Sequence, residues 1–579
     1  MYQQHYFIPK ESGTLTDTLV AFGMAEVIKE IVQRSMGSAQ VVLQDRGSCY
    51  VVDAGVVVEA DWIEQVGTFE QIPYLTSSKV AAPVDLPGLR MRDIDAEWEH
   101  FRQYNEQRKQ LAERKITGDE LEQQLADRKP AADWTVVTYL GDYRMQAQAI
   151  HNGLVEQWRR SGEGLSALNL RTLLGIFASL TADRGSLIEA WKKGAKAGGY
   201  DESVTASQLF NPHMGKGQNR AKANGLSMGN EKNFWLLDYL KAVGLWAASA
   251  PRNATNADLR KTYILAPHSL ALSHHQHIFK AFRERLWNST SVKLDIMAAL
   301  LYVDTLLEYT IEAEQLNIFQ QRSVSNLVAG MHVATYQLLS QNSYTMMNLS
   351  FLGLPDWLPE ITSYQDARRY RTIVQEHIER IGVIEEEKSE GNTLLQRYRD
   401  FAAGNDLQRF FAFSVGYGNY LISALERSAF YVKPFSEENL ERLLTMTSPK
   451  LTPIVENQGF RNIAEAIRRS TVIPQYIGRK SSNFEVRYGL GQELKRKAQY
   501  ADDFIQELGA FMQSYNEENA RVHERTKGQS RRKAITTDDI QAIVQLIDEH
   551  GSQTVCNLLI AFGYARDPKE PATPQTEPA

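Results

Sequence analysis

The chain has 579 residues, 43% of them hydrophobic and 23% charged, and its formal net charge is −6. That length is too great for one hydrophobic core and the composition is too apolar for a disordered protein, so two or three globular domains are expected. The chain has two cysteines and neither belongs to a CxxC pair, which excludes a disulfide framework and a cysteine-based zinc site. It has no apolar run long enough to span a membrane. These features predict a cytoplasmic protein.

The first 150 residues mix helical and strand patterns and predict an α+β N-terminal domain. Apolar residues at helical spacing predict a helix over 14–35, with Gly37 as its stop. Two β-rich runs on either side of the turn Asp45-Arg46-Gly47 are typical of a hairpin, and a third run predicts another strand: 40–43, 49–52 and 56–58.

A charged helical insertion is expected within this domain. Residues 95–129 are dense in Glu, Arg, Lys and Gln and predict a solvated helical pair, broken at 117–118 and ended before Pro130. The sequence favours a simple exposed hairpin over a contact with a neighbouring subunit.

Beyond about residue 145 the pattern is helical almost throughout. Broad apolar faces predict helices at 165–180, 235–246, 292–307 and 409–425. We therefore expect a mainly helical central domain over 151–470, which contains a long loop at 211–230, and a multidomain fold that is mostly α.

A C-terminal helical bundle is predicted over 471–565. Apolar residues that alternate in steps of four and three from Leu490 to Tyr515 predict one long helix with a narrow seam. A basic linker over 521–533 follows this helix.

Helix-end signals mark the last part of the bundle. The run from Thr536 to Asp539 predicts a helix start, Gly551 predicts its end, and a short helix is expected over 553–562. The polar, Pro-rich residues 566–579 predict a disordered tail.

A long polar segment without an apolar face begins at Asn211, and it contains no acidic residue up to Asn230. Its glycines allow backbone N–H groups to approach a partner, while its cations and amides suit phosphate contacts and the reading of base edges. We predict a DNA motif-reading loop that uses Asn211, His213, Lys216, Gln218, Asn219, Arg220 and Lys222. A surface loop with incidental charge is the alternative.

Positive charge also gathers near the C-terminus, although the chain as a whole is acidic. A basic outer face on a helical bundle would hold an extended single strand electrostatically. The predicted strand-binding residues are Lys495, Arg496, Lys497, Arg531, Arg532 and Lys533. The alternative is a solvated face whose charge is balanced by Glu517, Glu518 and Glu524.

No catalytic motif is recognisable. GxxxxGK[ST], GxSxG and HExxH are all missing from the sequence. His274 and His277 would share a face of a helix over 273–287, but no carboxylate has a suitable spacing to complete a metal site. We expect no catalytic residue, no metal and no cofactor. The alternatives are a metal-dependent nuclease that uses His274 and His277, and a helical scaffold without a nucleic-acid role.

Two parts of the chain resemble the large subunit of a type I CRISPR Cascade, of the Cas-eight type and subtype I-B-like. In the C-terminal part the similarity lies in Arg487-Tyr488-Gly489-Leu490-Gly491-Gln492-Glu493-Leu494, in 504–519, in Thr537-Asp538-Asp539-Ile540 and in 558–565. In the central part it lies in Asn211-Pro212-His213-Met214-Gly215-Lys216-Gly217 and in 235–245.

The resemblance implies a non-catalytic subunit of an RNA-guided DNA surveillance complex, with a C-terminal region like the small subunit. Such a subunit recognises a protospacer-adjacent motif in double-stranded target DNA and supports R-loop formation, while the CRISPR RNA reads the target by base pairing. The implied partners are the backbone and handle-binding subunits of Cascade, its small subunits, and a helicase–nuclease or transposition proteins. On this resemblance the 211–222 loop would read the motif, and the C-terminal cations would hold the displaced strand.

Overall fold

The computed structural model describes residues 1–114, 116, 119–198, 200, 202–214, 231–314, 318, 323–341, 343–404, 406–477, 483–529 and 532–566. Helices predominate in these residues, and every named strand lies before residue 354. The predicted fold class, mostly α with an α+β N-terminal part, is therefore confirmed. None of the helices in these ranges is long and apolar enough to cross a membrane.

The chain divides into two compact units. Unit 1 consists of Met1–Ser291 and Ser325–Gly353, and unit 2 consists of Val292–Val324 and the chain from Leu354 onward. These bounds differ from the expected divisions at 150 and 470, because strand pairing and helix packing join segments that are distant in the sequence.

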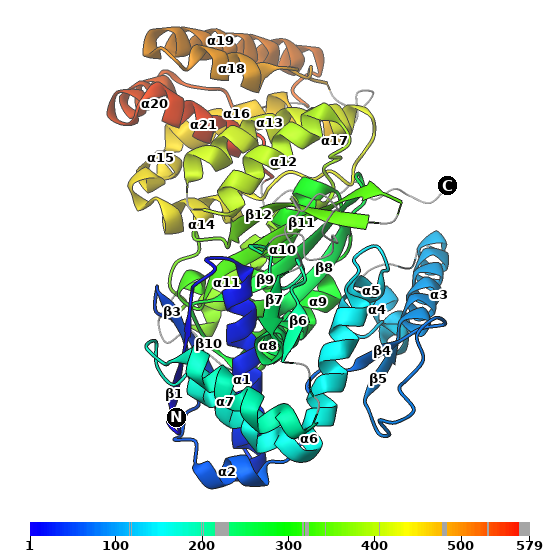
Figure 1. The fold of residues 1–579 in the computed structure, drawn as a ribbon. Coiled ribbons are helices and arrows are strands. Elements are labelled where there is room, and N and C mark those ends of the chain that lie inside the picture. Colours follow the sequence, from blue (N-terminus) through cyan, green and yellow to red (C-terminus); the bar gives the residue numbers. More distant parts are fainter. Residues whose placement is uncertain are drawn as a thin grey trace, which may run out of the picture. The chain divides into compact units, whose positions relative to one another are not determined.

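Unit 1 contains both four-stranded sheets, two strand pairs and the helices that pack with them (Figure 1). Its elements are β1 (His5–Pro9), α1 (Leu15–Met36), β2 (Val42–Asp45), β3 (Cys49–Asp53), α2 (Ala60–Gln65), β4 (Tyr74–Thr76), β5 (Met91–Asp93), α3 (Ile94–Glu113), α4 (Asp119–Leu125), η1 (Ala126–Arg128), α5 (Trp134–Gly141), α6 (Gln148–Ile176), α7 (Arg184–Ala195), η2 (Lys196–Gly198), β6 (Ser203–Thr205), β7 (Lys232–Phe234), α8 (Trp235–Ala248), β8 (Ser249–Ala254), β9 (Leu259–Pro267), β10 (Ser269–Ala271), α9 (Leu272–Arg285), β11 (Val328–Ser340) and β12 (Ser343–Gly353).

The N-terminal sheet has the antiparallel order β1-β3-β2-β10. The predicted hairpin is confirmed as β2 and β3, but the predicted strand at 56–58 is wrong, because β1 and β10 are the neighbours of the hairpin. Val58 is fully buried and its backbone N–H donates to the carbonyl of Gln3 at 3.1 Å. Burial in a connecting segment accounts for Val58 alone, because Val57 is 55% exposed.

Helix α1 confirms the prediction for 14–35. The Thr14 hydroxyl accepts from the backbone N–H of Thr16, and Gly37 ends the helix in the left-handed conformation with φ 77°. The helix crosses α8 with glycines at the contact: Gly23 faces the backbone of Leu240, and Gly244 faces the backbone of Leu19.

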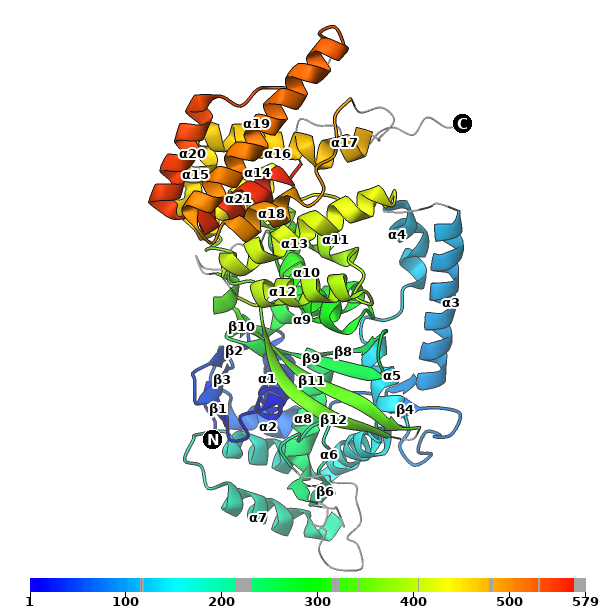
Figure 2. The ribbon, with the colours of Figure 1, turned by 90° about the horizontal axis from the view of Figure 1, so that it is seen from above.

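A second antiparallel sheet, in the order β12-β11-β9-β8, contradicts the prediction of an almost wholly helical chain beyond residue 145 (Figure 2). Strand β9 is buried at every position after its first, so its sequence does not alternate between polar and apolar residues. Periodicity therefore could not distinguish it from a buried helix.

The predicted charged helical pair corresponds to α3 and α4, which end before Pro130 as expected. Residues 117 and 118, where the break was predicted, lie outside the described residues. Helix α3 packs against α5, with the ring of Phe101 stacked on Trp134 at a centroid distance of 4.1 Å. The insertion is thus attached to the body of unit 1 by aromatic packing.

Unit 2 is helical in all of its described elements. These are α10 (Ser291–Glu312), η4 (Val324–Asn326), which spans the junction with unit 1, α11 (Tyr364–Gly382), α12 (Ser389–Ala402), α13 (Leu407–Glu426), α14 (Glu437–Thr447), η5 (Pro449–Leu451), α15 (Thr452–Glu456), α16 (Gln458–Ser470), α17 (Val472–Ile477), α18 (Leu490–Lys497), α19 (Ala501–Arg525), α20 (Thr537–His550) and α21 (Ser552–Gly563).

The single long helix predicted over 490–515 is two helices, α18 and α19. Tyr500 interrupts the run with an extended backbone, φ −121° and ψ 134°, and serves as the N-cap of α19. Asp502 and Asp503 then occupy the first turn, where the helix dipole favours acids. Most of the apolar seam is buried as expected, although Ala501 is exposed and Ile505 is half-buried, and the seam is divided between the two helices.

The helix-end signals near the C-terminus are confirmed. Thr536 and Asp539 form a capping box at the start of α20, and Gly551 ends that helix. Helix α21 follows over the range in which a short helix was predicted. Of the predicted tail, 567–579 lies outside the described residues.

Candidate nucleic-acid interface

Two paired strands flank the segment predicted to be the motif-reading loop. Strand β6 precedes the segment and β7 follows it, and the two strands pair antiparallel, with Val204 opposite Asn233. The ends of the segment are therefore held next to each other. Lys216, Gln218, Asn219, Arg220 and Lys222 lie outside the described residues.

Asn211 is part of a buried polar network at the base of this segment. Its side-chain oxygen accepts from Lys241 Nζ at 2.5 Å and from Asn233 Nδ2 at 3.1 Å, and its amide nitrogen donates to Asp238 at 3.3 Å. Lys241 also pairs with Asp238 at 2.6 Å. Because Asn211 has no exposed surface, it is not available as a DNA-reading side chain, and the prediction for this residue is corrected: its side chain joins the base of the segment to Asp238 and Lys241 of α8.

His213 is the exposed member of the described part of the segment. Its Nδ1 lies 3.4 Å from the hydroxyl of Thr16, at the start of α1. Desolvation of the ring, followed by the nearby charge of Lys241, lowers the pKa of His213 below its ordinary value. The imidazole is therefore suited to hydrogen bonding as a neutral group and adds no charge for phosphate binding at pH 7.

In unit 2 a groove of about 610 Å³ lies between α12, α13 and α18. Three cations line it, Arg397 from α12 and Lys495 and Arg496 from α18. Among the described residues that line the groove, Glu390 is the single acid, and the polar side chains are those of Ser389, Thr393, Asn419 and Gln492. This combination of cations, amides and hydroxyls suits contacts to a sugar–phosphate backbone.

Close packing around Tyr564 holds α18 beside α13. The hydroxyl of Tyr564 accepts from the backbone N–H of Gly491 at 3.2 Å. On α13, a Cβ at Gly418 would lie 2.9 Å from the Tyr564 ring, so that position requires a glycine-sized residue. The two walls of the groove are thereby fixed relative to each other.

The groove cations differ in how their charge is balanced. Lys495 Nζ donates to the neutral Asn557 at 2.5 Å, and Arg397 has no carboxylate partner within the described residues. Arg496 lies 3.5 Å from Glu493, with 72% of its side chain exposed. An exposed pair of this kind is worth little, so positive charge at the groove is largely uncompensated.

The other predicted strand-binding residues do not line this groove. Lys497 is on α18, and Lys533 is exposed with its Nζ 2.6 Å from Asn462 Oδ1. Arg531 lies outside the described residues.

The prediction that Arg532 binds a strand is wrong, because only 4% of its surface is exposed. Its guanidinium lies 3.4 Å from the centroid of the Phe484 ring and 3.6 Å from the carboxylate of Glu518. Asn519 holds its backbone from both sides, donating to the carbonyl and accepting from the N–H. Arg532 therefore joins α19 to the segment before α20 and is not available to a nucleic-acid strand.

No protein-family model matches the chain, and a search of the curated proteins finds no match.

The histidines considered as ligands of a nuclease metal site lie on α9. This helix confirms the one predicted over 273–287, although it ends at Arg285. His275 is buried, and its Nε2 donates to the carbonyl of Ala247 at 3.0 Å. His277 Nδ1 lies 2.9 Å from the carbonyl of Ser273. Across the part of the chain that the structure describes, no three His, Cys, Asp or Glu residues are grouped so that they would hold a metal ion.

Arg397, Thr393, Asn419 and Gln492 were missed by sequence reasoning. Their only sequence signal is a polar position on the exposed face of an amphipathic helix, which most surface residues share. Packing of three helices that are distant in the sequence brings them together.

Proposed function

We propose that the chain is a non-catalytic large subunit of a type I CRISPR RNA-guided DNA surveillance complex. The observation that carries the proposal is the groove of unit 2, where Arg397, Lys495 and Arg496 gather on an otherwise acidic protein. The sequence resemblance to Cascade large subunits gives the expected partners, which are CRISPR RNA, target DNA and the other Cascade subunits.

The groove would act by electrostatic attraction and by polar contacts that do not depend on base sequence. Each phosphate that a cation neutralises releases condensed counterions, which favours binding at low salt. Hydroxyl and amide groups beside the cations can donate to phosphate and sugar oxygens, so they hold a single strand without reading it. This chemistry suits the displaced strand of an R-loop.

Motif recognition is assigned to the segment that begins at Asn211. Its base is fixed by the buried Asn211–Asp238–Lys241 network, which supplies the rigid support that a reading loop needs. Arginine, lysine and amide side chains are the residues that recognise base edges in the major groove. The recruited effector, a helicase–nuclease or transposition proteins, would act after the R-loop has formed.

The test is a salt titration of single-stranded DNA binding by the full chain and by an Arg397→Ala, Lys495→Ala, Arg496→Ala variant. We expect the slope of log K against log salt to fall in magnitude by about 2, since each phosphate contact to a single strand contributes about 0.7. The same variant within a reconstituted complex should assemble but should capture target DNA less tightly.

The matched control removes the same charge elsewhere in unit 2. Arg409, Arg442 and Arg469 are each paired with carboxylates on or near their own helix, and none of them lines the groove. Their combined alanine variant should bind like the wild-type chain. An equal loss in both variants, or binding that salt does not change, contradicts the proposal and favours a helical scaffold.

A further inference from the structure

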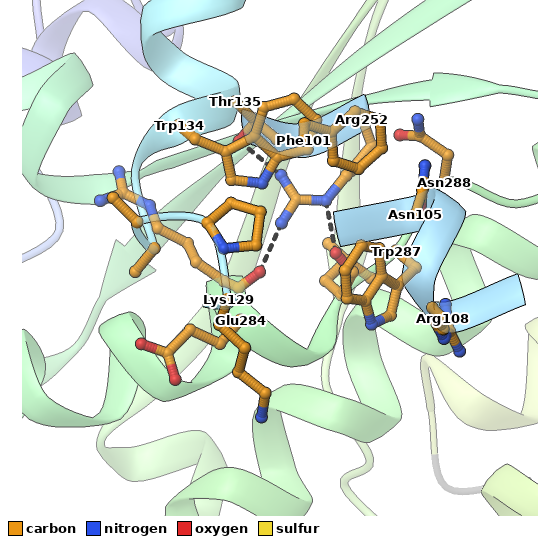
Figure 3. A pocket seen from close by; sticks show the side chains of 15 residues that line it. Phe101, Asn105, Arg108, Lys129, Trp134, Thr135, Arg252, Glu284, Trp287 and Asn288 are labelled. Atoms are coloured by element: carbon orange, nitrogen blue, oxygen red, sulfur yellow. Dashed lines mark hydrogen bonds between the residues drawn. The ribbon is translucent and has the colours of Figure 1, made fainter. Parts of the chain in front are cut away.

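A pocket of about 220 Å³ in unit 1 combines aromatic rings with buried positive charge (Figure 3). Helix α3 and the start of α5 form one side with Phe101, Arg108 and Trp134. The other side is formed by Arg252 of β8, Arg283 near the end of α9 and Trp287 just after that helix. The guanidinium of Arg252 lies at its centre, between Trp134 and Trp287 (Figure 3). Part of the predicted charged insertion, α3, is thus a wall of a pocket.

Two buried arginines define the electrostatics of this pocket. Arg252 is 3% exposed and donates to the carbonyls of Leu286, Pro251 and Arg283 and to the hydroxyl of Thr135, at 2.6–2.7 Å. Arg283 is 9% exposed and donates through Nε and Nη2 to the carbonyls of Ser249 and Trp246.

Neither guanidinium forms a direct ion pair within the described residues, and the hydrogen-bond acceptors of both are neutral. The opposite charges nearby are more distant: Asp133, which acts to raise the pKa of Arg283, and Glu284 in the pocket lining. Burial, together with the neighbouring charge of Arg283, lowers the pKa of Arg252 to about 9, and burial lowers the pKa of Arg283 to about 10. Both arginines are cationic at pH 7. A buried charge without a direct ion pair is costly, and an anionic ligand in contact with the guanidinium would reduce that cost.

Donors are left over for such a ligand. Arg252 has five N–H groups and uses four of them in the hydrogen bonds given above. The Nη1 group of Arg283 makes no hydrogen bond within the described part of the chain. A phosphate oxygen accepts several such bonds at once, so it satisfies both the charge and the free donors.

The remaining lining residues favour a planar ligand. Phe101 stacks on Trp134, and Trp287 stacks on Tyr104 with parallel rings at 5.7 Å. Arg108 lies over the Trp287 ring at 5.1 Å, and Asn105 and Asn288 add amides at the edge of the pocket. Rings, a guanidinium plane and amides are the groups by which proteins hold an unstacked base.

We infer that this pocket binds one nucleotide unit of a nucleic-acid strand, with its phosphate near Arg252, Arg283 and Arg108 and its base against the aromatic rings. The volume is below the roughly 300–1,000 Å³ of ordinary ligand pockets, so a single unit fits better than a dinucleotide. Glu284 is the single acid among the described lining residues and would disfavour a ligand with several adjacent phosphates. The inference goes beyond the proposed function, which rests on unit 2 and the segment from Asn211.

Calorimetric titration of the full chain with adenosine 5′-monophosphate, adenosine and inorganic phosphate tests the inference. The nucleotide should bind more tightly than either adenosine or phosphate alone, because only the nucleotide engages both the arginines and the rings. Arg108→Ala should weaken nucleotide binding about tenfold, the usual effect of losing a hydrogen bond to a charged group. Arg108 is exposed on α3, so this variant should fold normally.

Lys109→Ala is the matched control, because it removes the same charge from the next position of α3 and does not line the pocket. It should bind the nucleotide like the wild-type chain. Lys129→Ala, at a second point of the rim, should also weaken binding. Equal affinities for nucleotide, adenosine and phosphate, or wild-type affinity in both rim variants, overturn the inference.

The groove variant of unit 2 separates this inference from the proposed function. Arg397→Ala, Lys495→Ala, Arg496→Ala should lose strand binding and keep nucleotide binding in calorimetry. Loss of nucleotide binding in that variant also counts against a separate pocket in unit 1. If the groove variant keeps strand binding, the proposed function fails, but the calorimetric test of nucleotide binding in unit 1 still stands.

Discussion

Three buried histidines, and a fourth that is half-buried, are a feature of the molecule at the scale of single residues. Burial lowers the pKa of His151 and His332 to about 4 and that of His275 and His377 to about 3. Each is neutral at pH 7. Protonation of His275 would place a charge between Phe22 and Phe279, near the guanidinium of Arg283, so the folded state resists it.

We expect acid to destabilise unit 1 partly through His275. Its folded pKa is below the ordinary value near 6.5, so the unfolded chain binds the proton first, and stability present above pH 6.5 is lost as the pH falls toward 3. Between pH 7 and pH 5 this loss is about 2 kcal/mol. Urea titrations at the two pH values should show that His275→Gln removes that part of the pH dependence.

His277→Gln is the control, since His277 is exposed two residues farther along α9. It should keep the pH dependence of the wild-type chain. A His275→Gln variant whose unfolding free energy still falls by the wild-type amount would show that other groups carry the acid sensitivity.

At the scale of elements, the crossing of α1 and α8 depends on two glycines. Gly23 and Gly244 each face a backbone carbonyl of the other helix, and a Cβ at either position would overlap that carbonyl. Helices approach this closely only where no side chain separates their backbones. The contact matters for the candidate interface because α8 carries Asp238 and Lys241, which hold Asn211.

Gly244→Ala should therefore destabilise unit 1 by about 1–3 kcal/mol, the usual cost of overpacking. The expected sign is opposite to the intrinsic preference, since alanine is favoured over glycine in a helix by about 1 kcal/mol. Urea unfolding of the purified variant measures this difference.

Gly153→Ala on α6 is the matched control, because nothing lies within 4 Å of a Cβ at that position. It should stabilise the protein by about 0.5–1 kcal/mol. If both substitutions stabilise the protein, the inference that Gly244 is required for the close contact of α1 and α8 is wrong.

At the scale of the whole molecule, the chain passes from unit 1 to unit 2, back, and again to unit 2. Helix α10 belongs to unit 2, where the Glu386 carboxylate accepts from the backbone N–H groups of Val292 and Lys293 at 2.9–3.0 Å. Helix α21 is likewise tied to elements before residue 471. Arg468 donates to the carbonyl of Phe562, and Gly418 on α13 packs under Tyr564. The predicted C-terminal bundle is thus part of a larger helical unit.

A fragment of residues 471–566 should therefore not unfold cooperatively on heating, because it lacks α13 and α16, on which α21 packs. A fragment of 292–566, with a short Gly-Ser linker in place of 325–353, keeps these partners and should show one cooperative transition. Calorimetry and circular dichroism measure both. A cooperative transition in the shorter fragment would show that residues 471–566 fold as an independent domain, as the sequence predicted.

The sequence by itself determined several element boundaries and one turn. Thr14 and Gly37 mark the ends of α1, Thr536 and Asp539 mark the start of α20, and the turn at 45–47 joins β2 to β3, because these signals act within a few residues of the backbone they control. It also identified Lys495 and Arg496, two of the three cations of the groove.

Only the tertiary structure decided which of these residues meet. It added Arg397 to the groove, placed Arg532 and Asn211 in the interior, and made the charged helix α3 a wall of the pocket around Arg252. The strands β8, β9, β11 and β12 escaped prediction for the same physical reason. Pairing and burial are set by contacts between distant segments, and periodicity records only the immediate neighbours of each residue.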